Sequence, residues 1–401
     1  MDGLSDPHRM ITVEEARRIM MGHVRPMPAE FVSLHDAVLG VLAADAYAAD
    51  DHPRFDMSAV DGYAVAGGQG PWRVAGSIAA GEVMGRPLAA GECARIFTGA
   101  LVPEGTYAVL MQEECAMRNG AVHHAGPAPA KGANIRFKGE AFLKDELLLP
   151  KGACLGPAEI GLLASAGLHE VMVAALPAVA IVCTGGEFIQ PEGDTSGRIH
   201  SSNDFMLIAA LYSAGFYPEK TALKAGDDRN ELINALLRAQ EEGDAIITTG
   251  GVSVGDHDLV RAAREELGAE IHFHGVRQKP GKPMLFATLG EHPVFALPGN
   301  PRAVLVAWYE YLLPYLMAMQ GASQPWLRSE RLPLAHSVEL KGARAEFRAA
   351  QVSGGQVQLL PDEGSHMLTT MAMADAIAYF PPEQRQVRMR ESVEVHYLPK
   401  P

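Results

Sequence analysis

The sequence predicts a multidomain protein of mixed class, in which a central α/β domain with a mostly parallel sheet is flanked by β-rich parts. Three observations carry this prediction. Apolar strand-like runs alternate with helical runs over residues 178–325, which is typical of a buried parallel sheet covered by helices. Glycine- and proline-rich segments with short apolar runs fill residues 49–141 and 326–401, as in β modules. With 401 residues, the chain is long enough for several domains of roughly 150 residues.

Shifts in this pattern divide the chain into four expected domains. Residues 1–48 and 142–177 are expected to form a linker domain of mixed helical character. Residues 49–141 are expected to form a β-rich domain inserted into it. Residues 178–325 make the expected α/β domain, and residues 326–401 make a small C-terminal β domain.

Composition and charge exclude several classes of function. The chain is 48% apolar and 20% charged, with a mean hydropathy of +0.01, as in ordinary globular proteins. Its 34 basic and 48 acidic residues give a net charge of −14, which argues against nucleic acid or an anionic membrane as the main partner. The longest apolar run, Val171–Cys183, contains Pro177 and is shorter than the ~20 residues of a membrane span. We therefore expect no nucleic-acid partner and no membrane partner.

The cysteines and the N-terminus indicate the compartment. Cys93, Cys115, Cys154 and Cys183 lie far apart, and the lack of a Cys-x-x-Cys pair excludes a zinc ribbon. The first residues lack the basic start and the apolar core of a signal peptide. Reduced thiols in a cytoplasmic protein are therefore expected.

Three helices are expected in the linker domain. The first begins after Thr12, a plausible N-cap that precedes two glutamates in the first turn. The second is expected over Leu34–Leu42. The third is expected over Pro157–Ala166, where Gly167 ends it.

Strands and helices of the other domains follow from hydrophobic periodicity. Uninterrupted apolar runs predict strands of the α/β domain at Val179–Cys183, Asp244–Thr249, Met284–Phe286 and Val294–Leu297. Helical runs between them predict helices at Phe205–Leu211, Glu231–Leu237, Leu259–Leu267 and Arg302–Met317. Short apolar or alternating runs predict strands of the β domains at Trp72–Val74, Ala108–Met111 and Ser392–His396.

Three polar or glycine-rich turns follow strands of the α/β domain, at Thr184–Glu187, Gly250–Asp258 and Pro298–Pro301. In open α/β sheets, ligands bind outside the carboxyl ends of the strands. Because parallel strands end at one edge of the sheet, we expect the three turns to share a site.

The turn Gly250–Asp258 carries the most chemical information. Its glycines allow backbone N–H groups to approach an anion, and its serine adds a hydroxyl donor. These donors are Gly250, Gly251, Gly255 and Ser253. Asp256 and Asp258 can hold Mg²⁺, or a ring that presents N–H groups. A glycine-rich turn before a helix, with no ligand, is the alternative.

Two further turns suit an anion. Lys279 and Lys282 present ammonium groups on a turn fixed by prolines, although a solvated basic turn is the alternative. Pro298–Pro301 bends the chain and places Pro301 at the start of the next helix. The N-terminus of that helix favours an anion, although a structural turn remains open.

Other polar residues are ambiguous by themselves. Asp227 and Asp228 precede an expected helix, so one is expected to cap it and the other can face the site. In the β-rich domain, Asp61 and Thr98 each stand beside a glycine. A structural role in a turn explains each of these residues as well as a role in a site does. Arg136 can bind a phosphate or be an exposed structural arginine.

Familiar catalytic motifs are absent from the sequence. It contains no nucleophile elbow, no His-Glu-x-x-His pair and no Ser-His-Asp order. It also contains no Gly-x-x-x-x-Gly-Lys-Ser/Thr phosphate loop.

Taken in order, the motifs resemble the MoeA-type molybdopterin molybdenumtransferases, enzymes of molybdenum-cofactor assembly related to the E domain of gephyrin. The resemblance covers nearly the whole chain. Its segments are Asp56–Ala64, Ile96–Gly105, Asn134–Glu140, Thr184–Glu187, Ser202–Asn203, Gly250–Asp258, Lys279–Pro283 and Leu297–Pro301. Each motif is modest alone, but the ordered set is specific.

The resemblance implies an elongated homodimer with four domains per chain. It implies a reaction in which molybdate is exchanged into adenylylated molybdopterin, AMP is released and Mg²⁺ assists. It places the active site between the α/β domain of one subunit and the β-rich domain of the other. The adenylyltransferase of the preceding step and the receiving apo-molybdoenzymes are further implied partners.

The resemblance also implies roles for individual residues. Catalytic positions match Asp61, Thr98, Glu187, Asp227, Asp258, Lys279, Pro298 and Pro301. Substrate-binding positions match Arg136, Gly250, Gly251, Ser253, Gly255, Lys282 and Asn300. The metal would be held by the carboxylates of Glu187, Asp227 and Asp258.

The sequence departs from the family pattern at a few positions. Acidic residues usual in the family are replaced by Ala141, Gly186 and Ser201. Val60 replaces a methionine, and Gly275 replaces a lysine that some members carry. Two alternatives to the insertase therefore stay open: a non-catalytic molybdopterin-binding carrier or scaffold, and a molybdopterin adenylyltransferase. The additional β domains argue against the adenylyltransferase.

Overall fold

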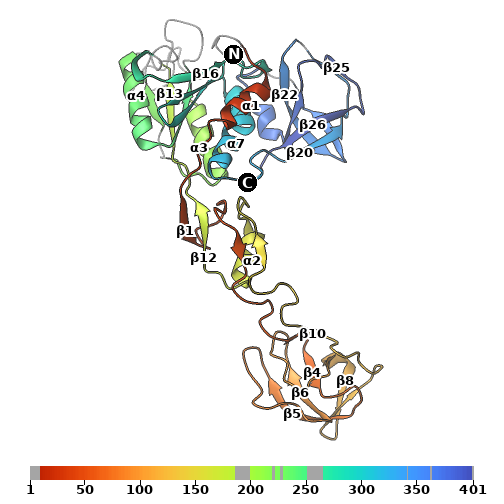
Figure 1. Cartoon of the computed structure of the whole chain (residues 1–401). Helices are drawn as coiled ribbons and strands as arrows, with labels where there is room; N and C mark the ends of the chain where they lie inside the picture. The colour runs from red at the N-terminus through yellow and green to blue at the C-terminus, as the bar shows by residue number, and fades with distance from the viewer. Residues whose placement is uncertain are drawn as a thin grey trace, which may run out of the picture.

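The molecule is elongated, with the α/β and C-terminal domains at one end and the β-rich domain at the other (Figure 1). A narrow linker domain joins the two ends. No helix in the part of the chain described here is long and apolar enough to cross a membrane. The computed structural model describes residues 10–185, 199–218, 222–225, 229–250, 265–340, 342–361 and 364–399.

A six-stranded sheet in the order β14-β13-β15-β19-β18-β16 forms the centre of the α/β domain. Its strands are β13 (Val179–Thr184), β14 (Leu223–Ala225), β15 (Ala245–Thr249), β16 (Glu270–His274), β18 (Leu285–Leu289) and β19 (His292–Leu297). The first four strands in this order run parallel, and β18 and β16 add an antiparallel edge. Every residue of β13 and β15 is buried, because helices cover both faces of the sheet. The predicted mostly parallel sheet is confirmed.

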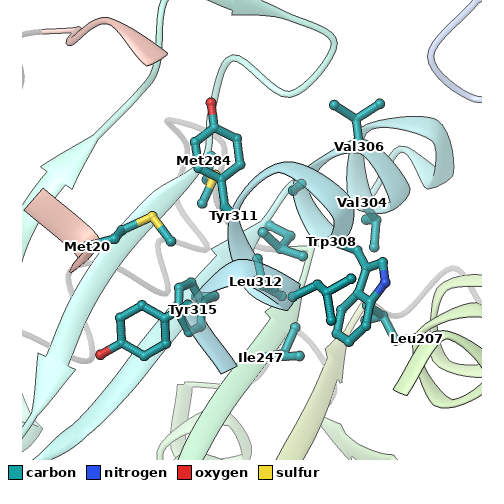
Figure 2. Close-up of a cluster of buried hydrophobic side chains, with 14 of the residues drawn as sticks. Met20, Leu207, Ile247, Met284, Val304, Val306, Trp308, Tyr311, Leu312 and Tyr315 are labelled. Atoms are coloured by element: carbon teal, nitrogen blue, oxygen red, sulfur yellow. The ribbon is translucent and has the colours of Figure 1, made fainter. Parts of the chain in front are cut away.

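Among the described residues, the helices packed on this sheet are α1 (Val13–Met21), α3 (Asn203–Ser213), α4 (Arg229–Glu242), α6 (Pro301–Ala307) and α7 (Leu313–Met319). Helix α4 packs on one face of the sheet, and the other four pack on the opposite face. Trp308, Tyr311 and Tyr315 fill the core on that second face (Figure 2). A π-helical turn, η2 (Trp308–Leu312), joins α6 to α7. The single helix predicted over Arg302–Met317 is confirmed, with this π turn as an unpredicted feature.

Helix α1 begins where the sequence predicts, because Thr12 and Glu15 form a capping box. The Glu15 N–H donates to Thr12 Oγ1 at 3.1 Å, and the Thr12 N–H donates to Glu15 Oε2 at 2.8 Å. Two backbone donors that a helix start leaves without intrahelical partners are thereby satisfied.

The linker domain pairs β1 (Ala29–Ser33) with β12 (Glu170–Ala174), and β2 (Ala46–Tyr47) with β11 (Leu147–Leu149). The predicted third helix is present as α2 (Pro157–Ser165). The helix predicted over Leu34–Leu42 is wrong, because this segment lies in turns. Several of its backbone N–H groups bond distant carbonyls instead, for example Leu42 N–H to Ala153 O at 2.9 Å. Such non-local partners leave no mark in the local pattern.

The β-rich domain contains a six-stranded sheet in the order β7-β4-β6-β5-β9-β8. Its strands are β4 (Gly62–Val65), β5 (Trp72–Ile78), β6 (Glu92–Ile96), β7 (Ala108–Met111), β8 (Cys115–Arg118) and β9 (Ala121–His124), with the 3₁₀ turn η1 (Gln112–Glu114). A short pair, β3 (Met57–Ser58) with β10 (Ile135–Arg136), lies beside it.

The C-terminal domain contains a sheet in the order β17-β22-β24-β26-β20, with β23 paired to β22. Its elements are β20 (Ser329–Pro333), β21 (Val338–Glu339), β22 (Ala345–Ser353), β23 (Gln356–Leu359), α8 (Thr369–Met373), β24 (Ala376–Phe380), β25 (Gln386–Val387) and β26 (Ser392–Tyr397). Strand β17 (Gln278–Lys279) comes from the preceding part of the chain and pairs in parallel with β22. One short strand thus connects the α/β chain to the C-terminal sheet.

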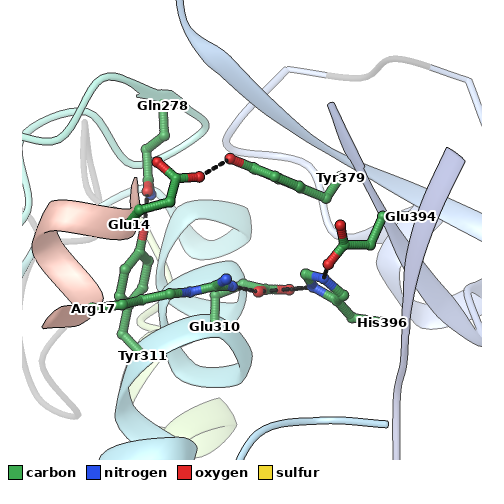
Figure 3. Close-up of polar contacts among 8 residues, drawn as sticks. All are labelled: Glu14, Arg17, Gln278, Glu310, Tyr311, Tyr379, Glu394 and His396. Carbon is green, nitrogen blue, oxygen red and sulfur yellow. Dashed lines mark hydrogen bonds and ion pairs between the residues drawn. The ribbon is translucent and has the colours of Figure 1, made fainter. Parts of the chain in front are cut away.

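A polar network joins the C-terminal domain to α1 and η2 (Figure 3). Glu310 is 2% exposed, and its carboxylate binds Arg17 and His396. The two ring nitrogens of His396 face carboxylates, Glu310 at 2.8 Å and Glu394 at 3.2 Å. Because ionised carboxylates only accept hydrogen bonds, this geometry favours the doubly protonated imidazolium.

Candidate active site

An open pocket of about 470 Å³ lies between the α/β domain and the C-terminal domain. Five basic residues are among those that line it: Lys279, Lys282, Arg302, Arg344 and Arg348. No Asp or Glu is among the described residues of its lining. We call it the basic pocket, and its cations suit a polyvalent anion.

Two of these cations stand on a short turn, residues 278–282, which we call the lysine loop. Strand pairing holds its first residues, since Gln278 lies opposite Ala345 and Lys279 opposite Glu346. Val276 N–H donates to Lys282 O at 2.9 Å and closes the loop. Gly281 has φ +88°, a conformation that favours glycine. Both predicted lysines therefore reach one pocket.

The turn Pro298–Pro301 forms the next side of the pocket. Pro301 is the first residue of α6, as predicted, and Asn300 is its N-cap. The helix continues through η2 to Met319. Because Asn300 and Arg302 line the basic pocket, the positive N-terminal end of this helix lies beside it. Asn203 Nδ2 donates to Gly299 O at 2.8 Å and ties α3 to this turn.

The carboxyl ends of β13, β15 and β19 lie side by side, as predicted for strands that share a ligand edge, and the unpredicted strand β14 extends this edge next to β13. Thr184 lies opposite Ala225, and its hydroxyl donates to Thr249 O at 3.1 Å. Gly250 follows with φ +88°, and a Cβ there would lie 2.6 Å from Thr184 O, so only glycine fits. Gly250 N–H also donates to Leu297 O at 3.1 Å, which joins this edge to the end of β19.

Several predicted site residues follow these strand ends in the sequence but lie outside the described residues. They are Glu187, Asp227, Asp228, Gly251, Ser253, Gly255, Asp256 and Asp258. The three predicted metal ligands are among them. Gly186, where an acid usual in the family is missing, also lies outside the described residues. Within the described ranges, no group of three or more His, Cys, Asp and Glu side chains is arranged to hold a metal ion.

Asp61 and Thr98 come together in the β-rich domain. Asp61 Oδ1 accepts the Thr98 N–H at 2.8 Å and the Thr98 hydroxyl at 2.7 Å. These two bonds lower the pKa of Asp61 below its usual value, so the carboxylate stays ionised. Gly62 is required next to it, because a Cβ would lie 1.7 Å from the carbonyl oxygen of Leu110.

The β-rich domain lies at the opposite end of the molecule from the α/β and C-terminal domains (Figure 1), whose residues line the basic pocket. Asp61, Thr98 and the exposed Arg136 on β10 are therefore not joined to Lys279 within one chain. Near β10, Ala141 is exposed and offers only its N–H, which donates to His52 O at 2.9 Å. The chain thus carries two separate groups of predicted site residues.

Sequence reasoning missed three arginines of the pocket, Arg302, Arg344 and Arg348, and the serine of its far wall, Ser365. Arg302 N–H donates to Ser365 O at 3.1 Å, which closes the pocket between the two domains. Arg344 directly precedes β22 and Arg348 lies within it, so these two arginines are four residues apart in the sequence. Ser201, a position where an acid was expected, donates to Asp204 at 2.7 Å.

Family models match three consecutive parts of the chain. They are described as the MoeA N-terminal region (domain I and II) over residues 11–167, a probable molybdopterin binding domain over 180–318, and the MoeA C-terminal region (domain IV) over 331–398.

Relatives of similar length match the chain along most of its sequence. It is 30% identical to a molybdopterin molybdenumtransferase of Haemophilus influenzae, over 96% of this chain and 98% of that protein. It is 34% identical to one of Nostoc sp., over 74% of this chain and 71% of that protein. A solved molybdopterin biosynthesis MoeA protein of Pyrococcus horikoshii is 27% identical, with a TM-score of 0.81 over 97% of this chain and 100% of that one.

Proposed function

The chain belongs to the MoeA family of molybdopterin molybdenumtransferases, and we propose that it inserts molybdenum from molybdate into adenylylated molybdopterin and releases AMP. Membership makes it an enzyme of the transferase class with a role in molybdenum-cofactor biosynthesis. The basic pocket is the observation that supports the proposed reaction, because molybdate and the phosphoanhydride of adenylylated molybdopterin are both anions.

The electrostatics of the pocket support this assignment. Five cationic side chains line the pocket of a protein whose net charge is −14, although one of them, Arg348, forms an ion pair with Glu346 at 3.5 Å. A local concentration of positive charge attracts small anions even when the whole protein repels them. Lysine and arginine donors form charge-assisted bonds to phosphate oxygens, and the N-terminus of α6 adds backbone donors.

We propose that the second half of the site comes from another subunit. Asp61, Thr98 and Arg136 would face the basic pocket of a partner, because they do not reach the pocket of their own chain. Exposed apolar side chains supply a surface for such a homodimer: Phe205 is 73% exposed and Tyr217 is 69% exposed. Sedimentation of the chain and of Phe205→Ser tests this, and a wild-type protein that sediments as a monomer would contradict it.

We propose that Mg²⁺ assists the reaction, held by Glu187, Asp227 and Asp258. These residues follow β13, β14 and β15 in the sequence, and carboxylate oxygens are the ligands that Mg²⁺ prefers. Bound Mg²⁺ would neutralise charge on the phosphoanhydride. Calorimetry of Mg²⁺ binding by Glu187→Gln tests the ligand set separately from turnover, and unchanged binding would exclude Glu187.

One observation favours a second candidate, a carrier that binds adenylylated molybdopterin and releases no AMP. Side chains at Ala141 and Ser201 supply no carboxylate, and the Ser201 hydroxyl is engaged with Asp204. A site with fewer acids can retain its ligand while turning it over slowly.

AMP release distinguishes the two candidates. Purified protein is mixed with adenylylated molybdopterin, Mg²⁺ and increasing molybdate, and the product is tested for activation of a cofactor-free molybdoenzyme. Molybdate-dependent AMP release with reconstitution supports the insertase, whereas tight nucleotide binding without release supports the carrier. Arg344→Ala should weaken turnover, and Arg388→Ala, an exposed arginine outside the pocket lining, is the matched control.

A further inference from the structure

A buried polar pair, Tyr311 and Gln278, connects the core to the basic pocket, because Gln278 is part of the pocket lining. Tyr311, on the π turn η2, is 0% exposed, and its hydroxyl donates to Gln278 Oε1 (Figure 3). Gln278 is also 0% exposed, and its amide nitrogen donates to Pro280 O at 3.0 Å. Both bonds lie in the interior, where an amide without partners is costly.

The chemistry of these groups fixes the direction of the two bonds. The carbonyl of Pro280 can only accept, so the amide nitrogen of Gln278 must face it. The amide oxygen is then left toward Tyr311, and the tyrosine hydroxyl must donate. Burial raises the pKa of Tyr311 well above its usual value, so this hydroxyl keeps its proton.

The acceptor of this chain of bonds is part of the lysine loop. Pro280 lies between Lys279 and Gly281, and a Cβ on Gly281 would lie 2.9 Å from the amide nitrogen of Gln278. The loop therefore rests directly on the amide. A shift of the amide would move the backbone that carries both lysines into the pocket.

We propose that Tyr311 is a positioning residue for the basic pocket: its hydroxyl fixes the Gln278 amide, and the amide holds the lysine loop in place for the anionic substrate. This role rests on the proposed function, and it assigns a task to the π turn. Rare π turns are often found at functional sites. Here the turn carries the buried tyrosine whose hydroxyl meets Gln278.

The same helix offers a matched control. Tyr315 is 1% exposed, and its hydroxyl donates to His23 O at 2.8 Å, away from the basic pocket. Tyr311→Phe and Tyr315→Phe each remove one buried hydroxyl and retain the ring. They therefore make similar demands on folding, but only Tyr311→Phe leaves the amide oxygen of Gln278 without its donor.

The experiment measures three quantities on the full chain: melting temperature, calorimetric Kd for inorganic pyrophosphate, and kcat and KM for AMP release. Tyr311→Phe should raise the pyrophosphate Kd about tenfold, and lower kcat/KM by a similar factor or more, since small displacements of binding groups are costly. Tyr315→Phe should leave the Kd and the kinetics unchanged. A merely structural role would lower both melting temperatures and spare both Kd values.

A double-mutant cycle supplies the second line of proof. Gln278→Met removes the intermediary, so adding Tyr311→Phe to it should have no further effect on the Kd if Tyr311 acts through Gln278. Additive effects, or equal Kd values for Tyr311→Phe and Tyr315→Phe, would overturn the proposal.

The pyrophosphate measurement keeps this proposal distinct from the proposed function. A wild-type protein that binds pyrophosphate but releases no AMP would refute the insertase, and the Tyr311→Phe comparison would still decide the positioning role. A wild-type protein that binds no pyrophosphate would overturn both.

Discussion

Mixing two inactive variants of the chain can show whether its active site is shared between subunits. The β-rich domain, which carries Asp61, and the domain pair that carries Lys279 lie at opposite ends of one chain (Figure 1). Asp61→Ala removes a carboxylate that Thr98 orients, and Lys279→Ala removes an ammonium group of the basic pocket. Each should lower kcat for AMP release about 10²- to 10³-fold, the usual effect of removing one preorganised polar group.

The expected recovery follows from counting sites. When equal amounts of the two variants associate at random, about half of the dimers contain one chain of each kind. Each mixed dimer has one site with both defects and one site with neither. The mixture should therefore regain about a quarter of wild-type activity, far above either variant alone.

The control pairs two defects from the same half of the site. In mixed dimers of Asp61→Ala and Thr98→Ala, each site retains one defect, so activity should stay at the level of the single variants. The assay measures AMP release against mixing ratio after mild dissociation and reassociation, with mixed dimers isolated by a tag on one chain. Isolated mixed dimers of Asp61→Ala and Lys279→Ala that remain inactive would refute the shared site.

Three further outcomes are expected within a single chain. The Thr98 N–H and hydroxyl both lower the pKa of Asp61, so Thr98→Val, which keeps only the N–H, should raise that pKa in a carboxyl NMR titration. Burial disfavours the charged form of His396, but its bonds to Glu310 outweigh burial and raise its pKa above 6.5. The resulting stabilisation is full below pH 6.5 and is lost as pH rises through the raised pKa, so the melting temperature should fall there, less so in His396→Asn. Gly62→Ala would place a Cβ 1.7 Å from a carbonyl oxygen of β7 and should destabilise the β-rich domain by about 3 kcal/mol in thermal unfolding.

For each of these three predictions, one experimental result would contradict the reasoning. If the titration of Asp61 is the same in wild type and Thr98→Val, the Thr98 hydroxyl does not lower the pKa of Asp61. Parallel melting curves across pH for wild type and His396→Asn would mean that His396 does not change charge on folding. Gly85→Ala, where a Cβ meets no atom within 4 Å, is the control for Gly62→Ala, and equal stability of the two would contradict the steric argument.

Local chemistry made much of this molecule predictable. The capping box of Thr12 and Glu15 involves residues three apart, so its pattern is visible in the sequence. Buried strands such as β13 and β15 are short, largely apolar runs, and their shared edge follows from parallel pairing. The lysines and the Pro298–Pro301 turn were found because their own neighbours carry the signal.

The failures have a common physical cause, which is dependence on distant partners. In the segment Leu34–Leu42, the N–H groups of Leu34, Leu39 and Leu42 bond carbonyls more than a hundred residues away, which breaks the helical pattern. Most residues of the π turn η2 are buried in the core, and no residue type in the sequence predicts such a turn. Arg344 and Arg348 become pocket residues only when β22 pairs with β17.

The basic pocket is therefore a property of the domain arrangement rather than of any one motif. Its cations come from the lysine loop, the start of α6 and the start of β22, segments separated by up to about seventy residues. Like charges gathered this closely repel one another, so other contacts must hold the segments together. The β17–β22 pairing provides one such contact. The network of Arg17, Glu310 and His396, which joins α1, η2 and β26, provides another. The C-terminal domain thus contributes to the basic pocket in two ways, by supplying two arginines and by anchoring the strand that carries Lys279.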